Sequence, residues 1–464
     1  MNQDLRSFLK DIEPLGPDYY VRVSKPVDPV YEPCIIQEKL AAAGRYPVVH
    51  FEHVNGSSLP LVTNLFGSYE MLGLALGIKP GEPKGKILET FRRRIEKPIP
   101  VTTISSAKAP VKEIIWNDID LSRLPIPKHA EKDSGKYFTI AYLITRDPET
   151  GIINAGVYRH EVKGKDSFAC MFNPSHNAGY IYRRYKELKK PMEAVLVIGH
   201  HPAAVIGTLT RGPMECNELE MMGALLGESL EVVPAETVDL PVPAWAEIAI
   251  EGVIDPTAET SDGPFAEYTG FYGPAKDPVA LMRVTAVTMR KNAIFHDLDP
   301  SHREHNLSGS LPFEASVFDS VKKLVPSVQG VYMPASGSCF FTAYVKIKKR
   351  VPGEGKSAGL AAIAADTNLK MAIVVNDDVD IYKEEEVLWA IATHCEADRD
   401  LTVIANAMGA HLNPAAYGEI RHQHGSMNSK LIIDATRPVT LPFAERIKPP
   451  QEAWNRIRLE DYIS

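Results

Sequence analysis

The chain of 464 residues is 44% hydrophobic and 24% charged, and its formal net charge is -8 at pH 7. This composition is typical of a globular protein with about two or three domains, and the excess of acid argues against nucleic-acid or anionic-membrane partners. The five cysteines are scattered without a Cys-x-x-Cys pair, which argues against a disulfide framework or a zinc ribbon. The N-terminus resembles an amphipathic helix rather than a signal peptide, and no apolar run approaches the ~20 residues of a membrane span. We therefore expect a cytoplasmic protein with no membrane partner.

The N-terminal part alternates between helical and extended patterns. Leu5, Phe8, Leu9 and Ile12 recur at helical spacing, which predicts a helix over 3–13. Further helices are predicted near 35–43, 68–77 and 83–95, and strands at 19–23 and 48–52. We expect an α/β domain over residues 1–105, with a proline-rich extended connector running from 97 to 128.

From about residue 137 the pattern changes to strands separated by turn residues. Helices over 176–189 and 217–226 interrupt this β-rich pattern, which predicts a central domain over 106–305. Its predicted strands are 137–145, 152–162, 167–172, 194–199, 246–253, 278–290 and 293–297.

After Pro312 the pattern returns to α/β, which predicts a C-terminal domain over 306–450. Predicted helices cover 313–324, 357–366 and 384–395, and predicted strands cover 328–333, 339–348 and 370–375. Residues 451–464 hold a short helix that we expect at a subunit interface.

The stretch from 259 to 274 has the most distinctive chemistry. Asp262 and Glu267 flank a Gly-Pro turn, and three aromatics follow at Phe265, Tyr268 and Phe271. A carboxyl group packed among aromatics has a raised pKa and can hold a proton near neutral pH. The alternative is an ordinary β-turn with solvated acids.

Three further residues are candidate metal ligands. Asn154, His176 and Glu218 offer an amide, an imidazole and a carboxylate without a thiolate, a set that suits Mg²⁺ or Mn²⁺. Glu220 would serve as well as Glu218. Taken singly, these residues also fit a turn Asn, a helix-start His and an exposed helix Glu.

Other charged residues suggest anion contacts. Arg159 is predicted on a strand, on the same face as Val157, where it would need acids such as Asp262 and Glu267 as partners. Lys370 begins an apolar strand and is a candidate phosphate contact. The segment containing His296 and Arg303 is either a cationic site for an anionic substrate group or a solvated loop.

Four motifs in chain order resemble the UbiD family of reversible decarboxylases, which use prenylated FMN. Asn154-Ala-Gly-Val-Tyr-Arg159 resembles the cofactor-binding strand, and Glu218-Leu-Glu-Met-Met-Gly-Ala-Leu-Leu-Gly227 resembles a family helix. Asp262-Gly-Pro-Phe-Ala-Glu267 is similar to the acidic-Gly-Pro-Phe-Gly-Glu signature, although Asp stands where relatives can carry Glu. Ser429-Lys-Leu-Ile-Ile-Asp-Ala-Thr-Arg-Pro438 resembles the C-terminal motif.

The resemblance implies site residues. It assigns catalysis to Arg159, Asp262 and Glu267, and its spacing selects Glu218 over Glu220 as a ligand of Mn²⁺ or Mg²⁺, beside Asn154 and His176. K⁺ is a further candidate ion. The implied cofactor-binding residues are Asn154, Ala155, Gly156, Val157, Tyr158, Arg159, Ser175, His176, Glu218 and Lys370.

The resemblance also implies an α+β fold in which a split β-barrel flavin-binding domain lies between α/β regions, in a homodimer or homohexamer supplied with cofactor by a flavin prenyltransferase. The modified flavin would accept electrons as CO₂ leaves, Glu267 would protonate the substrate carbon, and Arg159 would orient that acid. His296 and Arg303 resemble the 2,5-furandicarboxylate branch, which forms 2-furoate. The alternatives are a 4-hydroxy-3-polyprenylbenzoate decarboxylase of ubiquinone synthesis and an FMN-dependent reductase.

Overall fold

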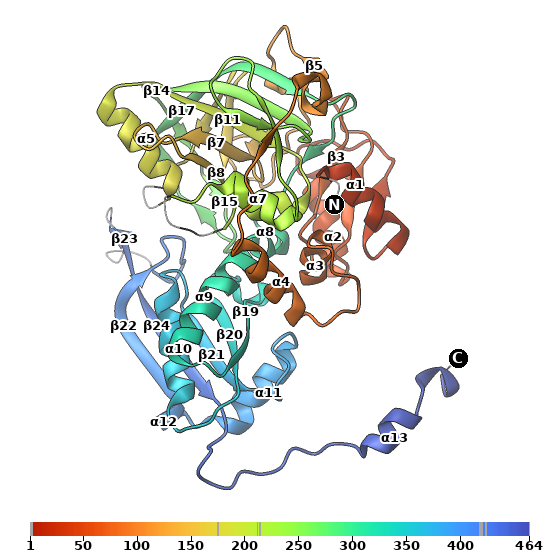
Figure 1. The fold of residues 1–464 in the computed structure, drawn as a ribbon, viewed down its shortest axis with the longest axis vertical. Coiled ribbons are helices and arrows are strands. Elements are labelled where there is room, and N and C mark those ends of the chain that lie inside the picture. The colour runs from red at the N-terminus through yellow and green to blue at the C-terminus, as the bar shows by residue number, and fades with distance from the viewer. Residues whose placement is uncertain are drawn as a thin grey trace.

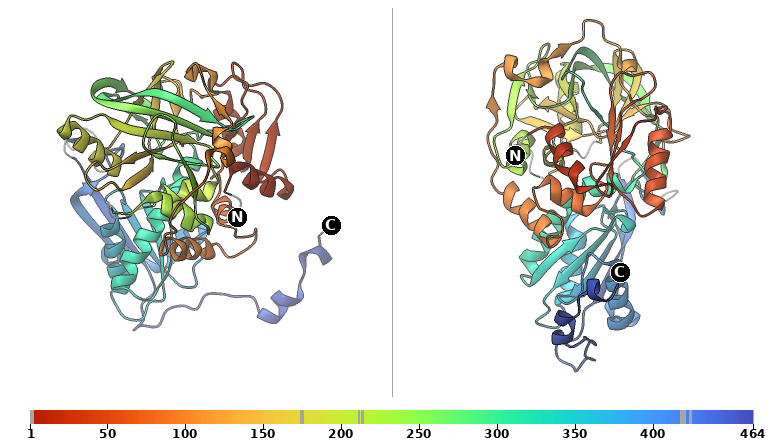
Figure 2. Two further views of the ribbon diagram at one scale, coloured as in Figure 1. Left: turned by 45° about the horizontal axis from the view of Figure 1, so that its top comes forward. Right: turned by 90° about the vertical axis from the view of Figure 1, so that its right-hand side faces the viewer.

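The computed structural model describes residues 3–173, 176–210, 212, 215–416, 421–422 and 425–463. A curled central sheet lies between an N-terminal α/β part and a C-terminal α/β part, and a tail extends away from the body (Figures 1 and 2). The predicted α+β class with a split-barrel centre is therefore confirmed, whereas the domain bounds stay a prediction. None of the helices in the described ranges is long and apolar enough to cross a membrane.

The N-terminal part begins with α1 (Leu5–Ile12), which buries the four apolar residues predicted to face the core. Asp4 caps the helix by accepting a hydrogen bond from the Ser7 amide at 2.8 Å. The adjoining sheet has the order β1-β2-β3-β18, so it contains one short strand from much later in the chain. The elements are α2 (Glu32–Ala42), α3 (Tyr69–Ala75), α4 (Gly85–Ile95), β1 (Tyr20–Val23), β2 (Val48–Phe51), β3 (Leu61–Thr63) and β18 (Phe295–His296).

The central sheet has the strand order β6-β9-β10-β17-β14-β11-β7-β8, with β5 paired to β17. Its two longest strands, β14 and β17, pair antiparallel with several register shifts, and such bulges bend a sheet and increase its twist. The strands are β5 (Ile114–Ile115), β6 (Tyr137–Phe138), β7 (Tyr142–Arg146), β8 (Ile153–Val157), β9 (His160–Gly164), β10 (Ser167–Cys170), β11 (Met192–Ile198), β14 (Ile248–Asp262) and β17 (Lys276–Met289).

The predicted single strand over 152–162 is wrong. The chain forms β8, leaves the sheet at Tyr158 and Arg159, and re-enters it as β9. Because β8 and β9 lie near opposite ends of the strand order, these two residues cross the open seam of the split barrel. Arg159 therefore owes its position to a break between strands and not to strand alternation.

Several smaller elements surround the central sheet. Three helices lie beside it: α5 and α7, which the sequence predicted, and α6, which it did not. A small sheet of order β13-β12-β4 and a hairpin of β15 with β16 complete this part. These elements are α5 (Asn177–Leu188), α6 (Pro202–Gly207), α7 (Glu218–Leu226), β4 (Thr102–Thr103), β12 (Glu231–Pro234), β13 (Pro241–Pro243), β15 (Phe265–Ala266) and β16 (Tyr272–Gly273).

The C-terminal part is a sheet of order β19-β20-β21-β24-β22 with β23 paired to β24. Helix α10 packs closely on β24, because a Cβ atom at Gly359 would lie only 2.2 Å from Ile432 Cγ2. The elements are α8 (Arg303–Ser308), α9 (Ser310–Leu324), α10 (Glu354–Ala365), α11 (Glu384–His394), α12 (Ala397–Asp400), α13 (Gln451–Arg456), β19 (Val328–Tyr332), β20 (Thr342–Ile347), β21 (Met371–Asn376), β22 (Leu401–Gly409), β23 (Arg421–His422) and β24 (Gly425–Ala435).

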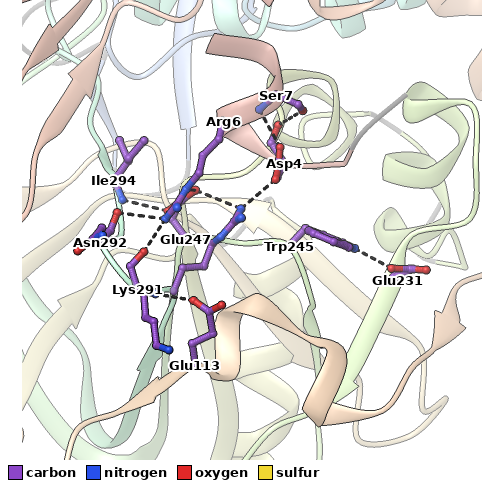
Figure 3. Close-up of polar contacts among 11 residues, drawn as sticks. Asp4, Arg6, Ser7, Glu113, Glu231, Trp245, Glu247, Lys291, Asn292 and Ile294 are labelled. Carbon is purple, nitrogen blue, oxygen red and sulfur yellow. Dashed lines mark hydrogen bonds and ion pairs between the residues drawn. The ribbon is translucent and has the colours of Figure 1, made fainter. Parts of the chain in front are cut away.

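A buried ionic cluster joins α1 to the central sheet (Figure 3). Glu247 accepts hydrogen bonds from Arg6 Nε at 2.9 Å and Nη2 at 2.8 Å, and from the Ile294 amide at 3.0 Å. Arg290 lies 3.4 Å from the same carboxylate and 3.1 Å from Asp4. The N-terminal helix is thereby fixed to the flank of the barrel.

Candidate active site

Arg159 bridges two acids at the barrel seam. It donates to Asp262 Oδ2 from Nε at 2.9 Å and from Nη2 at 2.5 Å, and it donates to Glu267 from Nη1. Asp262 ends β14, and Glu267 directly follows β15. The structure therefore brings together the three residues predicted to be catalytic, and all three side chains are largely buried.

The loop that carries the acids is held by residues that the sequence analysis did not single out. Asp133 accepts a hydrogen bond from the Ala266 amide at 2.8 Å, and Tyr137 Oη accepts one from the Gly263 amide at 3.0 Å. A Cβ atom at Gly273 would lie 2.9 Å from Glu267 Oε1. Asp133 lies in a Lys-Asp-Ser-Gly turn that looks like any surface loop, so the sequence carried no signal for its role.

Burial sets the proton affinity of both acids. It raises the pKa of Glu267 to about 7, even though Arg159 acts to lower it. Burial also raises the pKa of Asp262, again against the effect of Arg159. The Oδ1 atom of Asp262 is buried without a hydrogen-bond partner among the described residues. A carboxyl group with a pKa near 7 beside a fixed guanidinium can hold and deliver a proton at neutral pH.

A second polar group lies on β8 and α7. The Asn154 amide donates to Glu218 Oε1 at 3.0 Å, and the Ala155 backbone N–H donates to Glu218 Oε2 at 3.0 Å. Burial raises the pKa of Glu218 to about 7, and Asn154 Oδ1 is buried with no partner among the described residues. His176 precedes α5, with its ring 6.3 Å from that of Tyr158.

These residues fit a divalent cation that prefers oxygen and nitrogen ligands. No three His, Cys, Asp or Glu side chains within the described part of the chain gather as a metal site. A metal would therefore need the amide oxygen of Asn154 as well as Glu218 and His176. An amide oxygen, a carboxylate and an imidazole form a donor set for Mn²⁺ or Mg²⁺ rather than for structural zinc.

The remaining predicted cofactor residues lie in different places. Gly156 and Val157 complete β8, and the Tyr158 side chain folds back so that its Oη would be 2.5 Å from a Cβ atom at Gly156. Ser175 lies outside the described residues. Lys370 directly precedes β21, where its Nζ donates to Asn413 Oδ1 at 3.0 Å and lies 5.5 Å from the Phe341 ring centroid.

Lys370 reaches the acid loop through aromatic contacts. The Phe341 ring lies 5.9 Å from that of Tyr268, the residue after Glu267. The Phe340 ring lies 4.8 Å from the same tyrosine, nearly perpendicular to it. The two phenylalanines before β20 thus contact the acid loop, and Lys370 adjoins one of them, Phe341.

His296 and Arg303 lie on separate elements with separate contacts. His296 belongs to β18, lies 6.2 Å from the Phe66 ring, and has no partner for either ring nitrogen among the described residues. Burial lowers its pKa to about 3, which favours the neutral imidazole, and its place in a substrate site stays a prediction. Burial also lowers the pKa of His302 and of His305.

Arg303 supplies the positive charge of this segment. Its guanidinium carbon lies 4.3 Å from the Tyr46 ring centroid, and its Nε is buried without a partner among the described residues. It begins α8, a helix that the sequence patterns missed. In the same helix, the Asn306 side chain donates to the Tyr268 carbonyl at 3.2 Å, so α8 adjoins the acid loop.

Comparison with known families agrees with this architecture. The three domains of 3-octaprenyl-4-hydroxybenzoate carboxy-lyase match along the chain: the N-terminal domain over 17–91, the Rift-related domain over 102–302 and the C-terminal domain over 305–435. The chain belongs to the UbiD family of carboxy-lyases. It is a decarboxylase.

Several relatives are similar over nearly their whole length. HmfF from Pelotomaculum thermopropionicum, solved with FMN, is 38% identical with a TM-score of 0.92, covering 99% of this chain and 100% of that one. An evolved dimeric form of HmfF was solved with prenylated FMN. The anhydromevalonate phosphate decarboxylase of Methanothermobacter thermautotrophicus is 32% identical over 392 residues, 84% of this chain and 89% of that protein.

Vanillic acid decarboxylase from Sedimentibacter hydroxybenzoicus is 28% identical and has been solved in two forms. The open form, with a truncated companion subunit, has a TM-score of 0.88 and covers 99% of this chain and 98% of that one. The closed form has a TM-score of 0.83, with 99% of both chains covered. The present structure is more similar to the open form.

Proposed function

We propose that the protein catalyses the reversible, non-oxidative decarboxylation of a heteroaromatic acid with prenylated FMN, converting furan-2,5-dicarboxylate to 2-furoate and CO₂. The observation that carries the proposal is the buried bridge of Arg159 to Asp262 and Glu267, with the pKa of Glu267 raised to about 7 by burial. A reductase that transfers hydride has no evident use for this proton-holding cluster. The cluster favours decarboxylation, in which the carbon that loses CO₂ must gain a proton.

Each residue of the site has a separate role in the proposed reaction. When bound, prenylated FMN accepts the electron pair left by the departing CO₂. Asn154, His176 and Glu218 would hold Mn²⁺ or Mg²⁺, whose charge would neutralise the flavin phosphate, and Lys370 would supply a further positive charge to that phosphate. Two groups act on the substrate.

Glu267 donates its proton to the substrate carbon, and Arg159 orients that carboxyl group and stabilises the anion that remains. Asp262 fixes the edge of the guanidinium opposite Glu267, because it accepts hydrogen bonds from both Nε and Nη2 of Arg159. The arginine is therefore fixed before substrate arrives, which limits the reorganisation needed during proton transfer.

The substrate assignment rests on Arg303 and His296. A second carboxylate would meet an arginine whose Nε lacks a partner among the described residues and whose plane is held by Tyr46. His296 adds a neutral imidazole that can donate one hydrogen bond. A phosphorylated acid would suit the same arginine, and the 32% identity to anhydromevalonate phosphate decarboxylase favours this as a second candidate. A 4-hydroxy-3-polyprenylbenzoate would leave Arg303 without an anion.

Turnover by protein co-produced with a flavin prenyltransferase tests the assignment. Wild type and Arg303→Leu would be assayed with furan-2,5-dicarboxylate, anhydromevalonate phosphate, a polyprenyl-hydroxybenzoate and a mono-acid, with Arg303→Lys as the charge-retaining control. We expect Arg303→Leu to lose about 2–5 kcal/mol of binding to the dicarboxylate and to spare the mono-acid. Equal loss on every substrate would mean that Arg303 supports the fold and would reject the furandicarboxylate assignment.

We also propose that the tail joins subunits of a homodimer or homohexamer. It leaves the body as an extended segment (Figure 2), and Ile447 and Trp454 are 96% and 68% exposed. Apolar side chains this exposed mark a contact surface. Light scattering of wild type and an Ile447→Ser, Trp454→Ser variant would show a smaller particle for the variant if the tail holds subunits together.

A further inference from the structure

A second lysine lies beside Lys370 at the same end of the C-terminal sheet. Strands β21 and β24 are parallel, with Met371 opposite Leu431, and the Leu431 amide donates to the Lys370 carbonyl at 2.7 Å. Lys370 and Lys430 each directly precede these paired residues. Neighbouring positions in parallel register direct their side chains to the same face of the sheet.

Lys430 is nearly inaccessible, with 2% of its surface exposed. Its ammonium donates to the Thr367 carbonyl at 2.5 Å and to the Leu369 carbonyl at 2.6 Å. These acceptors belong to the turn that leads into Lys370, so Lys430 fixes the backbone from which the Lys370 side chain extends. Both acceptors are neutral carbonyl oxygens, and no ion pair to Lys430 is formed by the residues that the structure describes.

The surroundings make that charge costly. Burial, and then the nearby Lys370 ammonium, lower the pKa of Lys430 to about 8. Lys370 itself donates to the neutral Asn413 Oδ1, and Asn413 in turn donates to Asn428 on β24. Two cations held close together on neutral partners form a local positive potential, and an anion placed there would relieve their repulsion.

We propose that Lys430 is a positioning residue for the phosphate of the flavin cofactor: it holds the turn from which Lys370 extends and so directs the Lys370 ammonium at the phosphate. The inference rests on the proposed function, in which Lys370 contacts that phosphate. In the sequence, Lys430 is distinguished only as part of the C-terminal motif Ser429–Pro438. The structure shows that Lys430 holds the turn at Thr367 and Leu369 and that it lies beside Lys370.

Titration of the full-length apoprotein with FMN and with riboflavin, which lacks the phosphate, distinguishes the effect of the two lysines on phosphate binding from effects on the rest of the flavin site. The variants are Lys370→Met, Lys430→Met, their double mutant, and Lys430→Arg, which keeps the charge. We expect Lys430→Met to weaken FMN binding about tenfold, within the range for residues of one network, and to leave riboflavin binding unchanged. The double mutant should bind FMN no more weakly than Lys370→Met, and Lys430→Arg should retain most of the affinity.

Each other outcome has a definite meaning. Equal losses for FMN and riboflavin in Lys430→Met would show a purely structural role and overturn the inference. Additive losses in the double mutant would show that Lys430 acts on the phosphate independently, which also overturns it. If Lys370→Met itself did not discriminate FMN from riboflavin, the proposed phosphate contact of Lys370 would fail first. Should Lys430→Met not fold by circular dichroism, Lys430→Gln replaces it, since its amide can still donate to a carbonyl in the turn.

Discussion

Two buried clusters of arginine and carboxylate in this protein use the same groups to opposite effect. At the flank of the barrel, the single carboxylate of Glu247 faces two arginines and a backbone N–H (Figure 3). At the seam, the single guanidinium of Arg159 is divided between Asp262 and Glu267. Donors thus outnumber the carboxylate around Glu247, with Asp4 as a second acid for Arg290, whereas acids outnumber the guanidinium around Arg159.

The difference decides which cluster can do chemistry. A carboxylate that accepts several charge-assisted hydrogen bonds serves as a clamp between the elements that carry the donors. Burial raises the pKa of both Asp262 and Glu267, because the loss of water outweighs the lowering effect of the one arginine that the two acids share. One proton therefore remains available at the seam near neutral pH.

The largest expected effect is a loss of turnover when the proton donor at the seam is removed, compared with the same substitution at the flank. Glu267→Gln should reduce turnover by about 10²–10⁴-fold, because an amide cannot donate the proton, while the fold and flavin binding persist. Glu247→Gln, the matched change at the other cluster, should retain turnover per folded molecule. Steady-state CO₂ release and flavin absorbance of both variants measure this contrast. Near wild-type turnover by Glu267→Gln would remove its assigned role.

The cluster at the flank should instead affect the free energy of unfolding, and a half-exposed ion pair serves as the comparison. Glu247→Ala removes the carboxylate that accepts from Arg6, leaves the buried Arg290 with Asp4 as its remaining acid, and should lower the free energy of unfolding by about 3–5 kcal/mol. Glu259→Ala breaks only the half-exposed pair with Lys186 and should cost about 1 kcal/mol or less. Urea unfolding of the two variants gives both values. Similar losses would mean that the cluster at the flank is not a clamp.

A smaller effect tests how tightly the seam is built. Gly273→Ala places a methyl group against the Glu267 carboxylate and should slow turnover about 10²-fold through misplacement of the proton donor. Gly270→Ala in the same hairpin is not a suitable control, because Gly270 has a φ of 77°. Ala266→Gly offers a better one, since it introduces no clash. Unchanged turnover in Gly273→Ala would show that Glu267 tolerates displacement.

The smallest effect is a pH dependence. Because the pKa of Glu267 is raised to about 7, the acid is protonated below that pH and loses its proton above it. The rate of proton donation should therefore fall about tenfold per pH unit above 7. Profiles of kcat/KM between pH 6 and 9 at constant ionic strength would show this limb. A rate that rose across the same interval would contradict the assignment.

The sequence predicted much of the architecture because local periodicity survives folding. The helix over 3–13 and the alternation of strands and helices after Pro312 follow from apolar spacing alone. Short elements were missed, such as β3 and α8, because three to six residues carry too little periodicity to stand out. The Arg159 strand was misassigned because the break at Tyr158 and Arg159 contains no Gly, Pro, Asn or Asp to mark a turn. Only pairing partners on opposite sides of the seam divide β8 from β9.

By itself, the sequence determined the residue types and spacings of the site: two acids around a Gly-Pro turn, an arginine, and a set of oxygen and nitrogen ligands. Tertiary structure alone decided their electrical state. Burial lowers the pKa of His296 and raises the pKa of Glu267. The pairing of β21 with β24 places Lys430 beside Lys370. Each of these outcomes depends on how much water and which distant groups surround a side chain, and a linear pattern does not contain that information.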